Sequence, residues 1–462
     1  MNLERLQTTL EGGGTEALER LLKRGEFDPN GRPTVRNLTP LYWAIQHGYF
    51  DAVVLLLAYG AEVNAPVANG VTALYMACYR GHLDTVRLLL AEGILINAAS
   101  ERGESPLLEA AYYGHAEVAE VLLDHGANIE AIWRGWNDED HGKTPLVVSI
   151  QFDRFDVFKI LLRYGANPNK AKTNGETPLY IAVIHNRTAF LRDLLAYGAD
   201  PNVTRDDKTL VRLSCERGQM EMLQILLGNG ADSNAIDLDG RTELLWAASK
   251  GSVDLVNLLL FHGADIAAVD KDGMNALHLA AQHGHDKVVV TLLTRKVDIN
   301  VVNEAGKGAL HIACEDGSRS VVKILLAHGM DPGAKDTDGN TPLHLASRRH
   351  GISIASLLID RGSDIHAQNK FGQTPLALCL QRSDAVDTVA LLMTAHQLMS
   401  RGAKADEIVT TMSQDEPESI VSMCVRHWTL QQSRGEGVLT NVPFGVVRRG
   451  LKAVQKFLTD AI

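Results

Sequence analysis

One short pattern recurs along this chain at a nearly constant interval. A Thr-Pro-Leu unit, or a close variant of it, begins at Thr39 and returns as far as Thr374. Eight of the ten intervals are 33 residues, one is 39 and one is 32. A fixed period of this length predicts one continuous array of stacked units, because each unit is too small to bury its own apolar face. The units begin at Thr39, Thr72, Ser105, Thr144, Thr177, Thr209, Thr242, Asn275, Gly308, Thr341 and Thr374.

The letters within a unit predict two short helices separated by a turn. Thr can cap the start of a helix, and Pro fits its first position, where the missing N–H would have no partner. Nine residues after the start, most units carry Gly, for example Gly81 and Gly114. Glycine is typical of the left-handed residue that ends a helix, and Asp, Asn and His also tolerate a positive φ. The units without this glycine have Asp153, Asn186, His350 and Ser383.

The most regular unit is Thr341-Pro342-Leu343-His344-Leu345-Ala346, and this motif at a period of 33 resembles the ankyrin repeat. The resemblance covers roughly residues 1–395. It implies an all-α fold, an ankyrin-repeat solenoid of helix-turn-helix units joined by hairpin-like loops. It also implies a non-enzymatic scaffold for protein–protein interaction, with a partner protein bound in the concave groove of the solenoid.

The pattern divides the chain into three regions. Residues 1–30 are predicted to form a degenerate capping repeat, with turn glycines at Gly13 and Gly25. Residues 31–400 form the array of eleven units, so that about twelve repeats stack in all. Residues 401–462 form a helical tail, in which 446–460 reads as a basic amphipathic helix. We expect that helix to cover the last repeat, and a helix for a partner or a membrane surface is the alternative.

Two places depart from the period. The segment near 131–143 carries six extra residues, including Trp133 and Trp136, and insertions in such arrays lie in loops, often on the binding face. The sequence leaves open whether these rings bind a partner or pack on the array. The unit at Thr209 is one residue short, and Leu210 and Glu243 stand where Pro is usual in two successive units. We expect the solenoid to bend or open there.

Composition narrows the classes of partner. The formal net charge of −11 disfavours non-specific binding to nucleic acid or to anionic membranes. The first residues lack the apolar run of a signal peptide, and no segment has the length of a membrane span. Five cysteines show no short-range pairing, which suits a reducing compartment. We expect a monomer in the cytoplasm, with the nucleus left open as its location.

No catalytic or ligand-binding motif is recognisable. The chain has no phosphate-binding loop, no Cys-x-x-Cys, no His-Glu-x-x-His and no Gly-x-Ser-x-Gly. We therefore expect no cofactor, no metal and no enzyme activity. His278, His311 and His344 recur at one position of the unit, which indicates local hydrogen bonding. Glu109 lies where an apolar residue is usual, and we assign it no role.

The ankyrin resemblance implies that the hairpin tips and the ends of the first helices are the exposed contact positions. Tyr, Trp and Arg, the residues enriched at interface hot spots, gather at these positions in repeats two to four. We predict the partner surface there, unless the tyrosines only pad neighbouring repeats. An unconventional enzyme or small-molecule binder using the same aromatic groove is the alternative, and an adaptor whose tail recruits a second partner is a third. The candidate residues are Tyr79, Arg80, Arg102, Tyr112, Tyr113, Trp133, Trp136 and Phe152.

Overall fold

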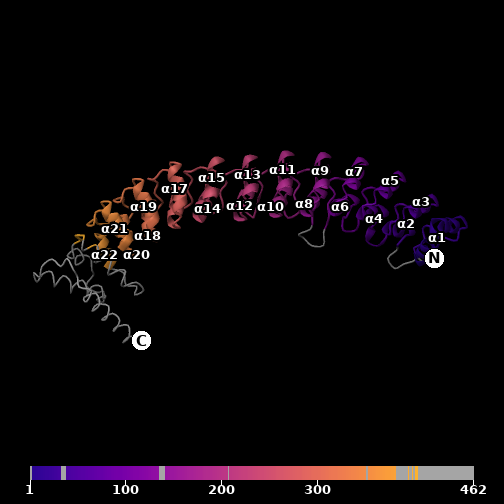
Figure 1. Ribbon diagram of the computed structural model, residues 1–462, viewed down its shortest axis with the longest axis horizontal. Helices are drawn as coiled ribbons and strands as arrows, with labels where there is room; N and C mark the ends of the chain where they lie inside the picture. Colours follow the sequence, from indigo (N-terminus) through magenta and orange to yellow (C-terminus); the bar gives the residue numbers. More distant parts are fainter. Residues whose placement is uncertain are drawn as a thin grey trace, which may run out of the picture. The chain divides into compact units, whose positions relative to one another are not determined.

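Pairs of short helices, repeated along the chain, build an all-α fold (Figure 1). The computed structural model describes residues 3–32, 38–134, 141–206, 208–349 and 352–380, together with 394, 398 and 401–403. The predicted tail helices, the turn positions His350 and Ser383, and Trp136 lie outside these residues. The predicted division at residues 30 and 400 stays a prediction.

Each repeat contributes a first and a second helix, with bounds that follow the sequence motif. The first helices are α2 (Pro40–Gln46), α4 (Ala73–Arg80), α6 (Pro106–Tyr113), α8 (Pro145–Gln151), α10 (Pro178–Ile184), α12 (Leu210–Glu216), α14 (Glu243–Lys250), α16 (Ala276–Gln282), α18 (Ala309–Asp316), α20 (Pro342–Arg349) and α22 (Pro375–Leu380). The second helices are α3 (Phe50–Ala58), α5 (Leu83–Ala91), α7 (Ala116–Asp124), α9 (Phe155–Arg163), α11 (Thr188–Ala196), α13 (Met220–Gly228), α15 (Val253–Phe261), α17 (Asp286–Thr294), α19 (Arg319–Ala327) and α21 (Ile352–Asp360). The remaining elements are α1 (Leu3–Lys23), the 3₁₀ turn η1 (Ala68–Gly70), β1 (Thr204–Arg205) and β2 (Lys208–Thr209).

The chain forms two compact units, one of Met1–Glu243 with Leu258–Ala264 and one of Leu244–Asn257 with Asp265–Ile462. In the first unit, the first helices α2 to α12 contact one another in order, and the second helices α3 to α13 do the same. In the second unit, α16, α18, α20 and α22 form one such row, and α17, α19 and α21 form another. Within each unit this stacking is the predicted solenoid (Figure 1).

The helix starts confirm the predicted caps. The Thr39 hydroxyl accepts the Tyr42 N–H at 3.1 Å, and the Ser105 hydroxyl accepts the Leu108 N–H at 3.3 Å. Each satisfies a backbone donor that the first turn of a helix cannot pair. Gly308 has no side chain for such a cap, and in its repeat the ring Nδ1 of His311 accepts a different donor, the Gly308 N–H, at 3.3 Å.

The turn between the helices confirms the predicted left-handed residue. Gly81 has φ 71°, and where glycine is missing Asp153 and Asn186 adopt φ 61° and 54°. Gly81 is needed for a second reason, because a Cβ there would lie 2.5 Å from Nδ1 of His115 in the next repeat. In α1 the interruption falls at Gly14, with φ 61°, one residue after the position that we predicted.

Each second helix has a fully buried leucine at a position that follows the sequence period: Leu56, Leu89, Leu122, Leu161, Leu194, Leu226, Leu259, Leu292, Leu325 and Leu358. The repeat histidines are also buried and make local hydrogen bonds, as predicted. Nδ1 of His344 accepts the Thr341 N–H at 3.1 Å, while its Nε2 donates to the Gln373 carbonyl at 3.0 Å. Four cysteines within the described residues are buried thiols.

The irregular repeat at Thr209 contains a buried ion pair. Arg212 occupies the position that histidine holds in the regular units, and its Nε donates to Oε1 of Glu243 at 3.0 Å. A second guanidinium nitrogen donates to Asp237 at 3.0 Å. Glu243 itself replaces the motif proline of the following repeat, so two departures from the motif are joined in one contact. The expected bend or opening of the solenoid stays a prediction.

Candidate partner-binding surface

Repeat register brings four aromatic side chains to one place in the first unit. Tyr79 and Tyr112 lie seven residues after the starts of their repeats, and Tyr113 and Phe152 lie eight residues after theirs. Tyr79 and Tyr112 are the second-to-last residues of α4 and α6, Tyr113 is the last residue of α6, and Phe152 follows α8. Because α4, α6 and α8 pack side by side in order, equivalent positions become neighbours in space.

The four rings form a continuous cluster, which we call the aromatic cluster. The ring centroids of Tyr79 and Tyr113 lie 4.6 Å apart, those of Tyr112 and Tyr113 lie 4.8 Å apart, and those of Tyr112 and Phe152 lie 4.2 Å apart. The ring planes are tilted by 47–64°. Tilted and edge-on contacts at this range are favourable for aromatic pairs. The sequence therefore predicted a set of residues that the structure brings into contact.

The backbone beneath the rings is fixed from the next repeat. Nε2 of His115 donates to the Tyr79 carbonyl at 3.2 Å, and Nε of Arg154 donates to the Tyr112 carbonyl at 3.0 Å. Both donors lie in the turn before a second helix, and each reaches back to the end of the first helix of the repeat before its own. Neighbouring repeats therefore hold in place the helix ends that carry the aromatic cluster. A surface that is already ordered has little conformational entropy left to lose when it is covered.

A buried acid lies beside the aromatic cluster. Glu109, in α6, is only 8% exposed, and its carboxylate is hydrogen-bonded to the Tyr75 hydroxyl of α4. Burial raises the pKa of Glu109 to about 7, the nearby charge of Glu104 adds to the rise, and the hydrogen bond from Tyr75 opposes it. The pKa of Tyr113 is raised by burial, by its hydrogen bond with Tyr79 and by the charge of Glu109.

The other candidate residues take different places. Arg80 lies over the ring of Tyr79, with its guanidinium carbon 5.4 Å from the centroid, and so belongs to the same surface. Arg102 is exposed, and its carbonyl accepts the Arg134 N–H at 2.8 Å, which ties the hairpin tip to the insertion. Trp133 packs at the base of the insertion. The ammonium of the buried Lys143 lies 5.3 Å from its ring centroid.

The backbone of the insertion begins as a small ladder. Trp133 and Lys143 pair in an antiparallel bridge, with the Trp133 N–H donating to the Lys143 carbonyl at 2.9 Å. The bridge fixes the backbone of Trp133 beside Lys143, and whether its ring binds a partner stays a prediction. The role of Trp136 stays a prediction, since that residue lies outside the described part of the chain.

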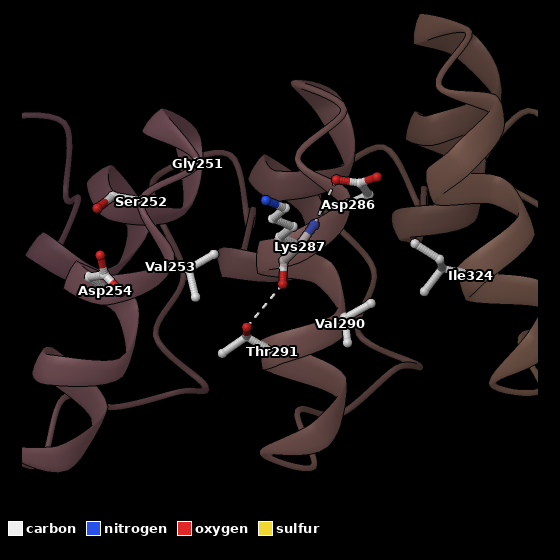
Figure 2. Close-up of a pocket in the computed structure, with 9 residues that line it drawn as sticks. All are labelled: Gly251, Ser252, Val253, Asp254, Asp286, Lys287, Val290, Thr291 and Ile324. Atoms are coloured by element: carbon white, nitrogen blue, oxygen red, sulfur yellow. Dashed lines mark hydrogen bonds between the residues drawn. The ribbon is translucent and has the colours of Figure 1, made fainter.

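A pocket in the second unit lies among α15, α17 and α19 (Figure 2). No aromatic side chain lines it. The Asp286 carboxylate accepts the Lys287 N–H at 2.8 Å, and the Thr291 hydroxyl donates to the Lys287 carbonyl at 2.9 Å (Figure 2). These polar groups serve the backbone of their own helix, and Asp286 and Lys287 bring opposite charges to the same wall. We assign this pocket no role.

Among the described residues, His, Cys, Asp and Glu do not gather in any group of three or more that could hold a metal ion. None of the helices in the described part of the chain combines the length and the apolar character needed to cross a bilayer.

Family models identify the repeats. A model of ankyrin repeats in three copies matches residues 66–132, 134–205, 211–303 and 277–369, and a model of ankyrin repeats in many copies matches residues 41–90. The chain belongs to the ankyrin-repeat family. Ankyrin repeats are in general non-enzymatic modules for protein–protein interaction, and the fold predicted from the sequence is confirmed. Among curated proteins, no match to the chain was found.

Glu109 is the site residue that sequence reasoning missed. The position four residues after the repeat start is apolar in the neighbouring ankyrin repeats, where Met76 and Val148 occupy it. A single acid in an apolar column was visible in the sequence as a departure. The sequence did not show which residue this acid interacts with. It is Tyr75, at the motif histidine position of the preceding ankyrin repeat, and the two side chains meet because α4 packs against α6.

Proposed function

We propose that this ankyrin-repeat chain is a non-enzymatic scaffold that binds a partner protein through the aromatic cluster of Tyr79, Tyr112, Tyr113 and Phe152. The observation that carries the proposal is that these rings form one connected surface at the ends of α4, α6 and α8. Residue types enriched at interface hot spots are here gathered in space as well as in sequence.

The exposure of the rings supports this role. Tyr113 is 36% exposed, and Tyr79, Tyr112 and Phe152 are half-buried. Each ring is therefore anchored on one side by the array and open on the other. Large, rigid side chains that are already ordered lose little conformational entropy on binding, which favours their use as anchors.

Affinity capture from a cell lysate tests the proposal. The bait is the full chain in three forms: wild type, the double variant Tyr112→Ala/Tyr113→Ala, and the control Tyr197→Ala. Tyr197 is 53% exposed at the end of the second helix α11, so the control also removes an exposed tyrosine ring, but from a different part of the chain. We expect the wild type and the control to capture the same protein and the double variant to lose it. Equal capture by all three would refute the proposal.

A second candidate function, small-molecule binding or catalysis at the same surface, has one observation in its favour. Glu109 is a buried carboxyl with a pKa of about 7 beside tyrosine rings, a combination found at functional sites. Screening a metabolite collection against the purified chain by thermal shift tests this function. A saturable stabilisation that disappears in Glu109→Gln would support it, and the absence of any such compound would count against it.

We also propose that the scaffold acts as a monomer in the cytoplasm or nucleus and does not bind nucleic acid. The net charge of −11 and the presence of the described cysteines as buried thiols support this setting. Sedimentation of the purified chain and fluorescence microscopy of the tagged chain are the direct measurements.

A further inference from the structure

The chemistry around the aromatic cluster is complementary to a positive charge. Aromatic ring faces attract cations, and this attraction grows where a carboxylate lies close by and water is partly excluded. Here the rings of Tyr79 and Tyr113 lie beside the buried Glu109, and Glu104 is close enough to act on the same carboxyl. The chain itself shows that such a ring face accepts a cation, because Arg80 lies over Tyr79.

Glu109 is the buried group in this arrangement that would be stabilised by a counter-charge. Burying a carboxylate is unfavourable unless a counter-charge or several hydrogen bonds accompany it. Among the described residues, the groups that act on the Glu109 carboxyl are Glu104 and the neutral hydroxyl of Tyr75, and neither brings a positive charge. A cation brought by a partner would supply the missing counter-charge.

We propose that the aromatic cluster and Glu109 receive a lysine side chain of the partner protein, an inference that rests on the function proposed above. The tilts between the rings favour lysine over arginine. The ring of Tyr113 is tilted by 64° from that of Tyr79 and by 59° from that of Tyr112, so it shares no flat face with either neighbour on which a planar guanidinium could stack, and the ring of Tyr79 already has the guanidinium of Arg80 over it. A compact ammonium on an apolar stem has no such requirement, and its stem can pack along the rings.

A probe that needs no knowledge of the partner tests the inference. Nα-acetyl-lysine methylamide is titrated into the full chain and followed by saturation-transfer NMR, with the arginine and norleucine analogues in parallel. The variants are Glu109→Gln, which keeps size and hydrogen bonding and removes the charge, and Tyr113→Leu. Tyr197→Leu, at an exposed tyrosine of α11, is the control.

We expect saturable binding of the lysine probe, weaker binding of the arginine analogue and none of the norleucine analogue. Removing one ring face is expected to weaken binding of the lysine probe by about two- to fivefold. We expect a loss of similar size in Glu109→Gln and no change in Tyr197→Leu. Equal binding of the norleucine analogue, tighter binding of the arginine analogue, or an unchanged affinity in Glu109→Gln would overturn the inference.

A second measurement separates this inference from the proposed function. The capture experiment is repeated on a lysate whose lysines have been acetylated, which removes their charge. We expect capture by the wild type to be lost, as it is by Tyr113→Leu with the untreated lysate. If capture survives acetylation while Tyr113→Leu abolishes it, the proposed function stands and lysine recognition is wrong. If Tyr113→Leu captures the same protein as the wild type, the proposed function itself fails.

Discussion

Replacing Glu109 by Gln should make this protein more stable at neutral pH and leave its stability at pH 4 nearly unchanged. Glu109 is buried, and its pKa is raised from 4.5 to about 7 chiefly by that burial. Gln has nearly the same shape and can still accept the hydrogen bond from Tyr75. The substitution therefore removes the charge with little change in packing.

The size of the effect follows from the pKa. In the unfolded chain Glu109 ionises near 4.5, and in the folded chain it holds its proton up to about pH 7. Between these values the folded state binds more protons than the unfolded state, so stability falls as the pH rises. The rise in pKa corresponds to about 3 kcal/mol of destabilisation that is absent below pH 4.5 and complete above pH 7. Gln at this position carries none of it.

Urea unfolding of the wild type and of Glu109→Gln at half-unit steps from pH 4 to pH 8 measures this difference. Because Glu243 also has a raised pKa, the pH dependence of the wild type alone mixes several groups, and only the difference between the two proteins isolates Glu109. We expect the stabilisation by Gln to grow steadily between pH 4.5 and pH 7. A difference that is constant across the range, or a variant that is less stable at every pH, would refute the reasoning.

Three further predictions concern the scaffold. Gly81→Ala combines strain at φ 71° with a 2.5 Å contact to His115, and we expect it to lower the melting temperature more than Gly60→Ala, which has open space at φ 84°. Arg212→Leu leaves Glu243 buried without its counter-charge and should destabilise by about 3–5 kcal/mol in urea unfolding, with recovery in Arg212→Leu/Glu243→Leu. Burial lowers the pKa of His278 from 6.5 to about 4, so between these pH values the unfolded state binds a proton that the folded state does not. The stability of the wild type should therefore fall as the pH is lowered from 6.5 to 4, and thermal melts of His278→Gln should show a smaller loss.

The fold was predictable because its rules are local. Thr39 and Ser105 cap helices in the way that their letters indicate, and Asp153 and Asn186 adopt the positive φ that their replacement of glycine implied. A solenoid adds only contacts between adjacent units, so a constant period in the sequence is enough to place each repeat against the next. No long-range pairing had to be guessed.

The candidate site was predictable to a lesser degree, for the same reason. Register alone made neighbours of Tyr79, Tyr112 and Phe152, since equivalent positions of successive repeats lie side by side. Register could not show that Tyr75 meets Glu109 or that Arg212 meets Glu243, because those pairs join different positions of adjacent repeats. Such contacts depend on side-chain length and direction.

Whether the aromatic cluster is the main contact surface is the central claim, and isothermal titration of the captured partner tests it most directly. The full chain is compared with single alanine variants at Tyr112 and Tyr113 and at three polar positions of the later repeats, Lys250, Gln282 and Glu315. We expect each tyrosine variant to lose more than about 1 kcal/mol of binding free energy and the three polar variants to bind like the wild type. Equal losses at all five positions would contradict it.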